Sequence, residues 1–137
     1  MQTVVFACVH NAGRSQMAAA LFNAAADPAR VRAISAGTRP GPHVHPEVVR
    51  VMAEIGIDLA DATPQRLTPA LAAGASFLIT MGCGDECPII PGATRDDWPL
   101  PDPKDLPLGE VRAIRDEISR RVTALVTAQH WSRRPPG

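Results

Sequence analysis

The chain has no tyrosine, only three phenylalanines and two tryptophans, and no excess of either charge, with 14 basic and 14 acidic residues among 137. The even charge excludes an overall field that would attract nucleic acid or an anionic membrane surface, so any anion binding must be local. No apolar run approaches the roughly 20 residues that span a bilayer, and no charged-then-apolar leader precedes residue 3. These absences favour a soluble, cytoplasmic, monomeric protein.

Cysteine is scarce as well, with three residues, and an odd number cannot pair completely within one chain. Structural disulfides are rare in the reducing cytoplasm, so reactivity is the better explanation for these thiols. The length suits one compact domain that needs neither metal nor disulfides to bury its core. We expect this domain to span residues 1–130, with a flexible tail at 131–137.

Apolar runs alternate with helical patterns along the chain. Buried strands are predicted at 3–8, 31–38 and 76–81, and helices at 14–26, 46–56, a short segment from 68 and a long amphipathic segment at 109–129. The predicted apolar face of the last helix comprises Val111, Ile114, Ile118, Val122 and Leu125. The proline-broken segment 95–107 allows at most a short strand, and part of loop 40–46 is expected to be disordered. The pattern predicts an α/β fold, with about four mostly parallel strands between two layers of helices.

Two cysteines follow predicted strands of this sheet. Cys8 ends the first strand and Cys83 comes just after the third. Ligands of open α/β sheets bind beyond the carboxyl ends of the strands. We therefore expect both thiols at one rim of the sheet.

The segment "CVHNAGRS" joins the first strand to a helix, where backbone N–H groups and the helix dipole favour a bound oxyanion. Arg14 would grip two oxygens of that anion with its planar fork, and the positive surroundings would favour the Cys8 thiolate as a nucleophile. Ser15 can donate a hydrogen bond to the thiolate, and Asn11 can hold the turn. The predicted oxyanion-binding residues are Val9, His10, Asn11, Ala12, Gly13, Arg14 and Ser15.

This buried strand, cysteine, five-residue spacer, Arg-Ser and helix resemble the phosphate loop of the low-molecular-weight protein tyrosine phosphatases. The resemblance implies a three-layer fold with a four-stranded parallel sheet flanked by helices. It also implies that an aspartate followed by proline acts as general acid, and "LPDPKD" supplies Asp102 and Pro103.

The segment "MGCGDEC" holds two further thiols, Cys83 and Cys87, for which a phosphatase has no use. On a helical turn their spacing places the Cα atoms about 6 Å apart, which a disulfide accepts. The flanking glycines would also let Cys83 reach the Cys8 sulfur.

Together with "SAGT", "DDWPLPDP" and "RDEI", these motifs resemble the thioredoxin-coupled arsenate reductases of the phosphatase fold. That resemblance implies attack of Cys8 on arsenate, then a disulfide relay through Cys83 to an exposed Cys83–Cys87 pair, which thioredoxin reduces. Phosphate or sulfate would compete with arsenate, and no cofactor or metal is needed. The lack of tyrosine agrees with it, because phosphatase relatives usually carry aromatic residues around the pocket.

Departures from the family and other interpretations stay open. Some relatives bind potassium behind the loop through acidic residues, but Ala19 and Gln65 stand at those places, so we do not expect the ion. Other relatives use a low-molecular-weight thiol such as mycothiol or bacillithiol as reductant.

A phosphotyrosine phosphatase and an oxyanion-binding thiol switch are the alternative functions. A zinc site of His43, His45, Cys83 and Cys87 is disfavoured, because two histidines one residue apart on an extended chain point to opposite sides.

Overall fold

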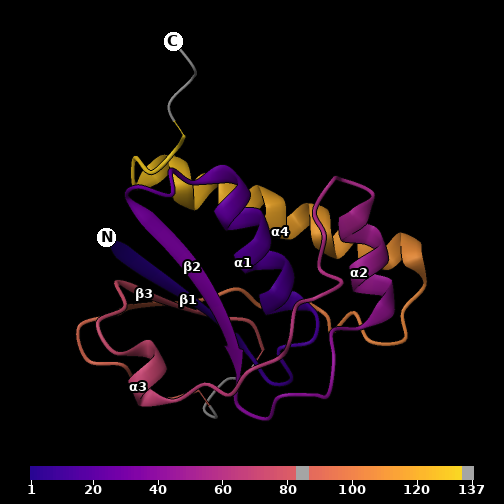
Figure 1. Ribbon diagram of the computed structural model, residues 1–137, viewed down its shortest axis with the longest axis horizontal. Helices are drawn as coiled ribbons and strands as arrows, with labels where there is room; N and C mark the ends of the chain where they lie inside the picture. The colour runs from indigo at the N-terminus through magenta and orange to yellow at the C-terminus, as the bar shows by residue number, and fades with distance from the viewer. Residues whose placement is uncertain (83–86, 134–137) are drawn as a thin grey trace.

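A single sheet of four parallel strands forms the centre of the computed structural model, which describes residues 1–82 and 87–133 (Figure 1). The strands lie in the order β2-β1-β3-β4. Their bounds are Gln2–Cys8 for β1, Val31–Gly37 for β2, Phe77–Thr80 for β3 and Thr94–Asp97 for β4. The fourth strand is the short one that the sequence allowed, and all four of its residues are exposed. The predicted fold class is confirmed, and the carboxyl ends of all four strands share one rim.

Helices cover both faces of the sheet, unequally. The larger core lies between the sheet and the helices α1 (Arg14–Ala25), α2 (Pro46–Ala53) and α4 (Leu108–Ala128), and the smaller core lies beneath the short α3 (Pro69–Ala72) (Figure 1). Strand β1 alternates between them, since Phe6 and Cys8 belong to the larger core and Val5 and Ala7 to the smaller. The central strand is thus buried on both sides, as its continuous apolar sequence predicts.

The buried face of α4 differs from the prediction at one position. Val111, Ile114, Ile118 and Val122 are buried as expected, but the fifth buried residue is Val126. Leu125 packs against the core only partly buried. At 3.6 residues per turn, Val126 continues the row of Ile118 and Val122 at a spacing of four, so it faces the sheet more directly than Leu125 does.

The carboxyl end of the described chain is packed against the domain. Trp131 is only 2% exposed and its ring lies edge-on against Phe22 and Phe77, with centroids 5.9 and 5.7 Å away. Arg133 donates hydrogen bonds to the carbonyls of Asn23 and Ala24. The domain therefore continues through Arg133, three residues beyond the predicted end of the domain.

An ion-pair cluster fastens α2 to α4. The Glu54 carboxylate, at the end of α2, accepts hydrogen bonds from Arg112 at 2.7–3.1 Å and from Arg115 at 3.1 Å. The hydrogen bond from Arg112 is the main cause that lowers the pKa of Glu54 to about 2. The cluster therefore joins the carboxyl-terminal end of α2 to α4.

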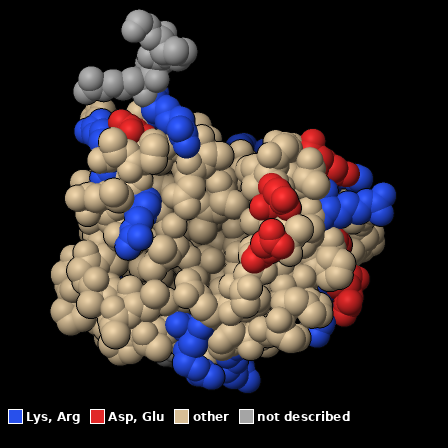
Figure 2. Space-filling view, viewed as in Figure 1, with Lys and Arg blue, Asp and Glu red and all other residues tan. Residues whose placement is uncertain are grey.

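Among the described helices, none combines the length and the apolar character needed to cross a membrane. Figure 2 shows basic and acidic side chains scattered among uncharged atoms on the visible face, in agreement with the even charge of the sequence.

Candidate active site

The loop between β1 and α1 turns its carbonyl groups outward. Consecutive carbonyl oxygens of Cys8, Val9 and His10 accept hydrogen bonds from the backbone N–H groups of residues 38, 39 and 41 at 2.8–3.2 Å. The Ala12 oxygen accepts from the N–H of His45 at 2.9 Å. Loop 38–45 is thus tied to the candidate anion loop along its length. The expectation of partial disorder in 40–46 is wrong, because these backbone bonds hold the segment in place.

This orientation of the carbonyls sets the direction of the loop's N–H groups. In a planar trans peptide the N–H points opposite to the preceding C=O, so carbonyls bound on the outside leave N–H groups directed inward. The loop also ends at the first turn of α1, which begins at Arg14 and carries the positive end of the helix dipole. The geometry supports the predicted oxyanion cradle at residues 9–15.

The Cys8 sulfur lies at the floor of this loop, where it is buried and receives two hydrogen-bond contacts. The Asn11 N–H donates to Sγ at 3.2 Å, and Ser15 Oγ lies 2.9 Å from Sγ. Asn11 Nδ2 donates to Ser15 Oγ at 2.7 Å, so Ser15 accepts there and its own proton is directed to the sulfur. Two donors are therefore directed at the sulfur of Cys8, the predicted nucleophile.

Arg14 joins the loop to two other segments. Its Nη1 donates to the carbonyl of Leu100 at 2.9 Å, and the side chain is largely buried. Its guanidinium also lies directly over Gly82, where any Cβ would collide with Nη1. Gly82 itself has a φ of +98°, a conformation that suits glycine. The residue before Cys83 therefore packs on Arg14, the predicted anion-binding residue.

Asp102 lies beside Arg14, as its predicted role requires. One carboxylate oxygen is 4.0 Å from Arg14 Nη2, and the other accepts a hydrogen bond from the Lys104 N–H at 3.0 Å. The following Pro103 packs on the loop so closely that a Cβ at Gly13 would lie 2.6 Å from its Cγ. The side chain of Asp102 is 45% exposed, so a proton can exchange with solvent there. The structure thus brings Cys8, Arg14 and Asp102 to one rim.

Of the two remaining cysteines, the described residues include only Cys87. Cys83 lies outside the described residues. Cys87 is described, and it is buried in the smaller core with Val5, Leu78 and Ile90. The expected surface position is therefore wrong for Cys87, because apolar neighbours beneath α3 enclose it.

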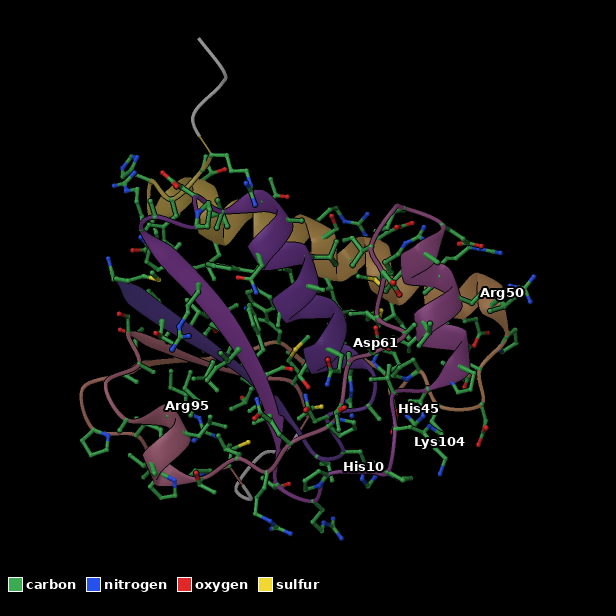
Figure 3. The ribbon with its side chains drawn as sticks, in the orientation of Figure 1. His10, His45, Arg50, Asp61, Arg95 and Lys104 are labelled. Carbon is green, nitrogen blue, oxygen red and sulfur yellow. The ribbon has the colours of Figure 1, made fainter. Side chains whose placement is uncertain are left out.

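A cavity of about 370 Å³ adjoins the outer side of the loop. Its lining residues are His10, Ala12, Gly41, Pro42, His43, His45 and Lys104, of which Figure 3 labels His10, His45 and Lys104. Among the described residues, no aromatic ring other than histidine borders it. All five phenylalanine and tryptophan rings pack against one another in the larger core: Phe6, Phe22, Phe77, Trp98 and Trp131.

The residues behind the loop do not fit a resident cation. The carbonyl and side-chain oxygens of Asn11 and the carbonyl of Thr63 all face the amide nitrogen of Gln16, at 3.1–3.4 Å. Ala19 offers no oxygen ligand on its side chain, and the Gln65 amide donates to the Ser35 carbonyl at 2.8 Å. For zinc, the part of the chain that is described contains no group of three or more histidine, cysteine or carboxylate residues that could hold a metal ion.

Sequence reasoning missed Gln16, and it missed loop 38–45 as the partner of the anion loop. Gln16 follows the Arg-Ser pair inside a helix-forming run, where a glutamine is usually exposed. Its burial depends on Asn11 and Thr63, which are 5 and 47 residues away, so no local pattern could reveal it. The backbone bonds of loop 38–45 leave no signal in side-chain type.

Comparisons with known proteins agree with this geometry. The chain is 39% identical over 126 residues to a Halobacterium salinarum protein named provisionally as an arsenate reductase, covering 88% of this chain and 87% of that one. It is 30% identical to the glutaredoxin arsenate reductase of Synechocystis, covering 92% of this chain and 97% of the relative. The thioredoxin-dependent arsenate reductase of Corynebacterium glutamicum superposes with a TM-score of 0.82 at 38% identity. That match covers 95% of this chain and 62% of the larger neighbour.

The sequence model of one family matches almost the whole chain. The model describes the low molecular weight phosphotyrosine protein phosphatases, and it matches residues 3–133. Those residues include the loop at 8–15, the acid at Asp102 and every helix and strand described above except the first residue of β1. The chain therefore belongs to the low molecular weight phosphotyrosine protein phosphatase family.

Proposed function

We propose that this chain is an arsenate reductase in which Cys8, Cys83 and Cys87 pass two electrons to arsenate, and that thioredoxin restores the thiols. The contact between Gly82 and Arg14 carries the proposal, because it joins the cysteine-bearing segment to the anion loop. A phosphatase has no need of further thiols at that place. The relatives named as arsenate reductases support the same substrate.

The first step uses the loop and Asp102. Arsenate binds to the inward N–H groups and to Arg14, and the Cys8 thiolate attacks arsenic opposite a hydroxyl group. Asp102 supplies the proton with which this hydroxyl leaves as water. The arsenic–oxygen bond breaks as the sulfur–arsenic bond forms, and arsenic stays in the +5 state.

The second step is the reduction. The Cys83 thiolate attacks the Cys8 sulfur, and the electron pair of the sulfur–arsenic bond moves to arsenic, which leaves as arsenite in the +3 state. A Cys8–Cys83 disulfide remains. Cys87 then attacks Cys83, which frees Cys8 and leaves a Cys83–Cys87 disulfide. The dithiol of thioredoxin reduces that disulfide by two further exchanges.

The burial of Cys87 places a condition on the last exchange. A thiolate of the reductant must reach a sulfur of the oxidised pair, and Cys87 is only 4% exposed. We expect the segment around Cys87 to leave the smaller core when the oxidised enzyme meets its reductant. Glutaredoxin and low-molecular-weight thiols are the competing reductants, the first of them suggested by the Synechocystis relative.

Phosphotyrosine hydrolysis is the second candidate function, because Cys8, Arg14 and Asp102 would also support it. The family membership favours it. The aromatic content does not, since all five phenylalanine and tryptophan rings pack in the larger core and none of them borders the cavity beside the loop, where it could stack on a phenol.

Arsenate-dependent oxidation of NADPH, with purified thioredoxin and thioredoxin reductase, tests the proposal. We expect turnover with the native chain and its loss in Cys8→Ser, Cys83→Ser and Cys87→Ser. The Cys87→Ser variant should still release one arsenite per chain in a single turnover, because the first two thiols suffice for one reduction. Hydrolysis of para-nitrophenyl phosphate by the same samples reports the competing activity.

The outcomes separate the candidates. Normal multiple turnover by Cys87→Ser with thioredoxin would refute the three-thiol relay. Rapid nitrophenol release without NADPH loss would identify a phosphatase. Turnover with glutaredoxin or a small thiol, and none with thioredoxin, would keep the relay and replace the reductant. A protein inactive in every assay, with a thiol that oxidises reversibly, would be the thiol switch.

A further inference from the structure

We propose that Gln16 is a positioning residue for Cys8, in which one side-chain amide takes the place of a bound cation behind the anion loop. The inference concerns the reactivity of Cys8 itself. It deepens the proposed function but rests only on the geometry of the loop, which a phosphatase would share.

The amide nitrogen of Gln16 sits among three carbonyl-type oxygens. Nε2 lies 3.1 Å from the Asn11 backbone oxygen, 3.2 Å from Asn11 Oδ1 and 3.4 Å from the Thr63 oxygen. Gln16 is 7% exposed, so these contacts are shielded from water. Three oxygens around one point are an arrangement that suits a cation as well as an amide donor. Here the NH₂ group of the Gln16 amide occupies the point among these three oxygens.

Asn11 needs this support because its backbone is in an unfavourable conformation. Its φ is +51°, in the left-handed region that non-glycine residues adopt at a cost. That conformation directs the Asn11 N–H to the Cys8 sulfur at 3.2 Å. By binding both the backbone and the side-chain oxygen of Asn11, Gln16 holds the residue in the turn that makes this bond possible.

Gln16 also sets the direction of the hydrogen bonds that reach the sulfur. Donation from Gln16 Nε2 and from the Gln65 N–H fixes which end of the Asn11 amide carries the oxygen. Asn11 Nδ2 must then face Ser15 Oγ, which accepts and passes its own proton toward Cys8 Sγ. A side chain at position 16 that cannot donate would weaken both contacts with the sulfur, the one from the Asn11 N–H and the one from Ser15 Oγ.

Alkylation of Cys8 by iodoacetamide, followed as a function of pH on the Cys8 peptide by mass spectrometry, tests the proposal. The variants are Gln16→Met, which keeps the length without a donor, and Gln16→Glu, whose carboxylate would face three oxygens. Exposed Gln129→Met is the matched control. We expect Gln16→Met to slow the alkylation of Cys8, because about one hydrogen bond to the sulfur is lost. The rate at neutral pH should fall about 3- to 10-fold, and further in Gln16→Glu.

A second arm compares potassium with N-methylglucamine at equal ionic strength. We expect the native rate to be the same in both, since the oxygens are already occupied. A pH profile unchanged in both Gln16 variants, with only a lower melting temperature, would overturn the proposal and leave Gln16 a packing residue. A native rate that requires potassium would overturn it too. Because the assay contains no arsenate, its outcome is independent of the proposed function.

Discussion

In the proposed function Arg14 has two tasks, and a lysine should not replace it. Its Nη1 donates to the Leu100 carbonyl, and we propose that its Nη2, which lies 4.0 Å from Asp102, binds the anion. An ammonium group on a flexible chain cannot bind the Leu100 carbonyl and two oxygens of an anion in one plane. We expect Arg14→Lys to lower kcat/KM for arsenate about 100-fold.

Steady-state kinetics with thioredoxin would measure that loss, with exposed Arg32→Lys as the control. Circular dichroism should show that Arg14→Lys remains folded. An Arg14→Lys variant within twofold of the native kcat/KM would show that a point charge is sufficient at this position, and that the fork geometry has no role in catalysis.

At the scale of elements, the turn after β3 determines how closely the cysteine-bearing segment approaches the anion loop. Gly82 has a φ of +98° and lies against the Arg14 guanidinium, whereas Gly92 has a φ of +83° and no atom within 4 Å of the point that a Cβ would occupy. Both substitutions by alanine should cost about 1–2 kcal/mol of folding stability, because both force a left-handed alanine. Only Gly82→Ala should also displace Arg14 and reduce arsenate turnover, by about 10-fold or more.

Chemical denaturation of the two variants measures the backbone strain of the left-handed alanine. Turnover assays show whether the Arg14 side chain is also displaced. Equal activity of Gly82→Ala and Gly92→Ala would contradict the contact between the turn and Arg14. A loss of activity confined to Gly82→Ala, at similar stability, would place the segment that leads to Cys83 against the anion-binding group in solution.

Elements that are specified by the pattern of side chains can be predicted from the sequence. Elements that are held by backbone hydrogen bonds cannot. Strand β1 and helix α1 follow from apolar runs and helix formers, and with them the loop that carries Cys8 and Arg14. Strand β4 consists of exposed Thr, Arg and Asp residues and is held by its pairing with β3, so its sequence resembles a loop. Loop 38–45 is fixed in the same way, by N–H groups that bind the carbonyls of the anion loop.

At the scale of the whole molecule, a row of aromatic rings connects the active-site end of the sheet to the carboxyl end of the chain. Trp98 packs on Phe6 at 5.6 Å, Phe6 on Phe22 at 5.9 Å, and Phe22 on Trp131 at 5.9 Å. The small, polar and proline-rich residues that follow Trp131 in the sequence predict a flexible tail that begins at residue 131. The partners of Trp131 are more than 50 residues away in sequence, so only the folded structure reveals its burial.

This packing predicts where the domain ends. Trp131→Ala should lower the free energy of unfolding by about 3–5 kcal/mol, because it opens a cavity between Phe22 and Phe77. A chain cut after His130 should lose at least as much, since the hydrogen bonds of Arg133 disappear as well. A chain cut after Arg133 keeps all of these contacts and should match the native melting curve. Ile55→Ala, at a half-exposed position, is the control.

Denaturant unfolding followed by circular dichroism measures these differences, and Cys8 alkylation below the transition shows whether the site is affected. We expect the alkylation rate of Trp131→Ala to equal the native rate wherever the variant is folded, because Trp131 lies at the opposite end of the aromatic row from Trp98. Burial of a large side chain contributes more than about 1 kcal/mol to stability. A loss smaller than this in Trp131→Ala would show that residues 131–133 form a tail and are not part of the domain. A large loss with unchanged Cys8 reactivity would establish that the carboxyl-terminal residues belong to the domain and stabilise it without taking part in the site.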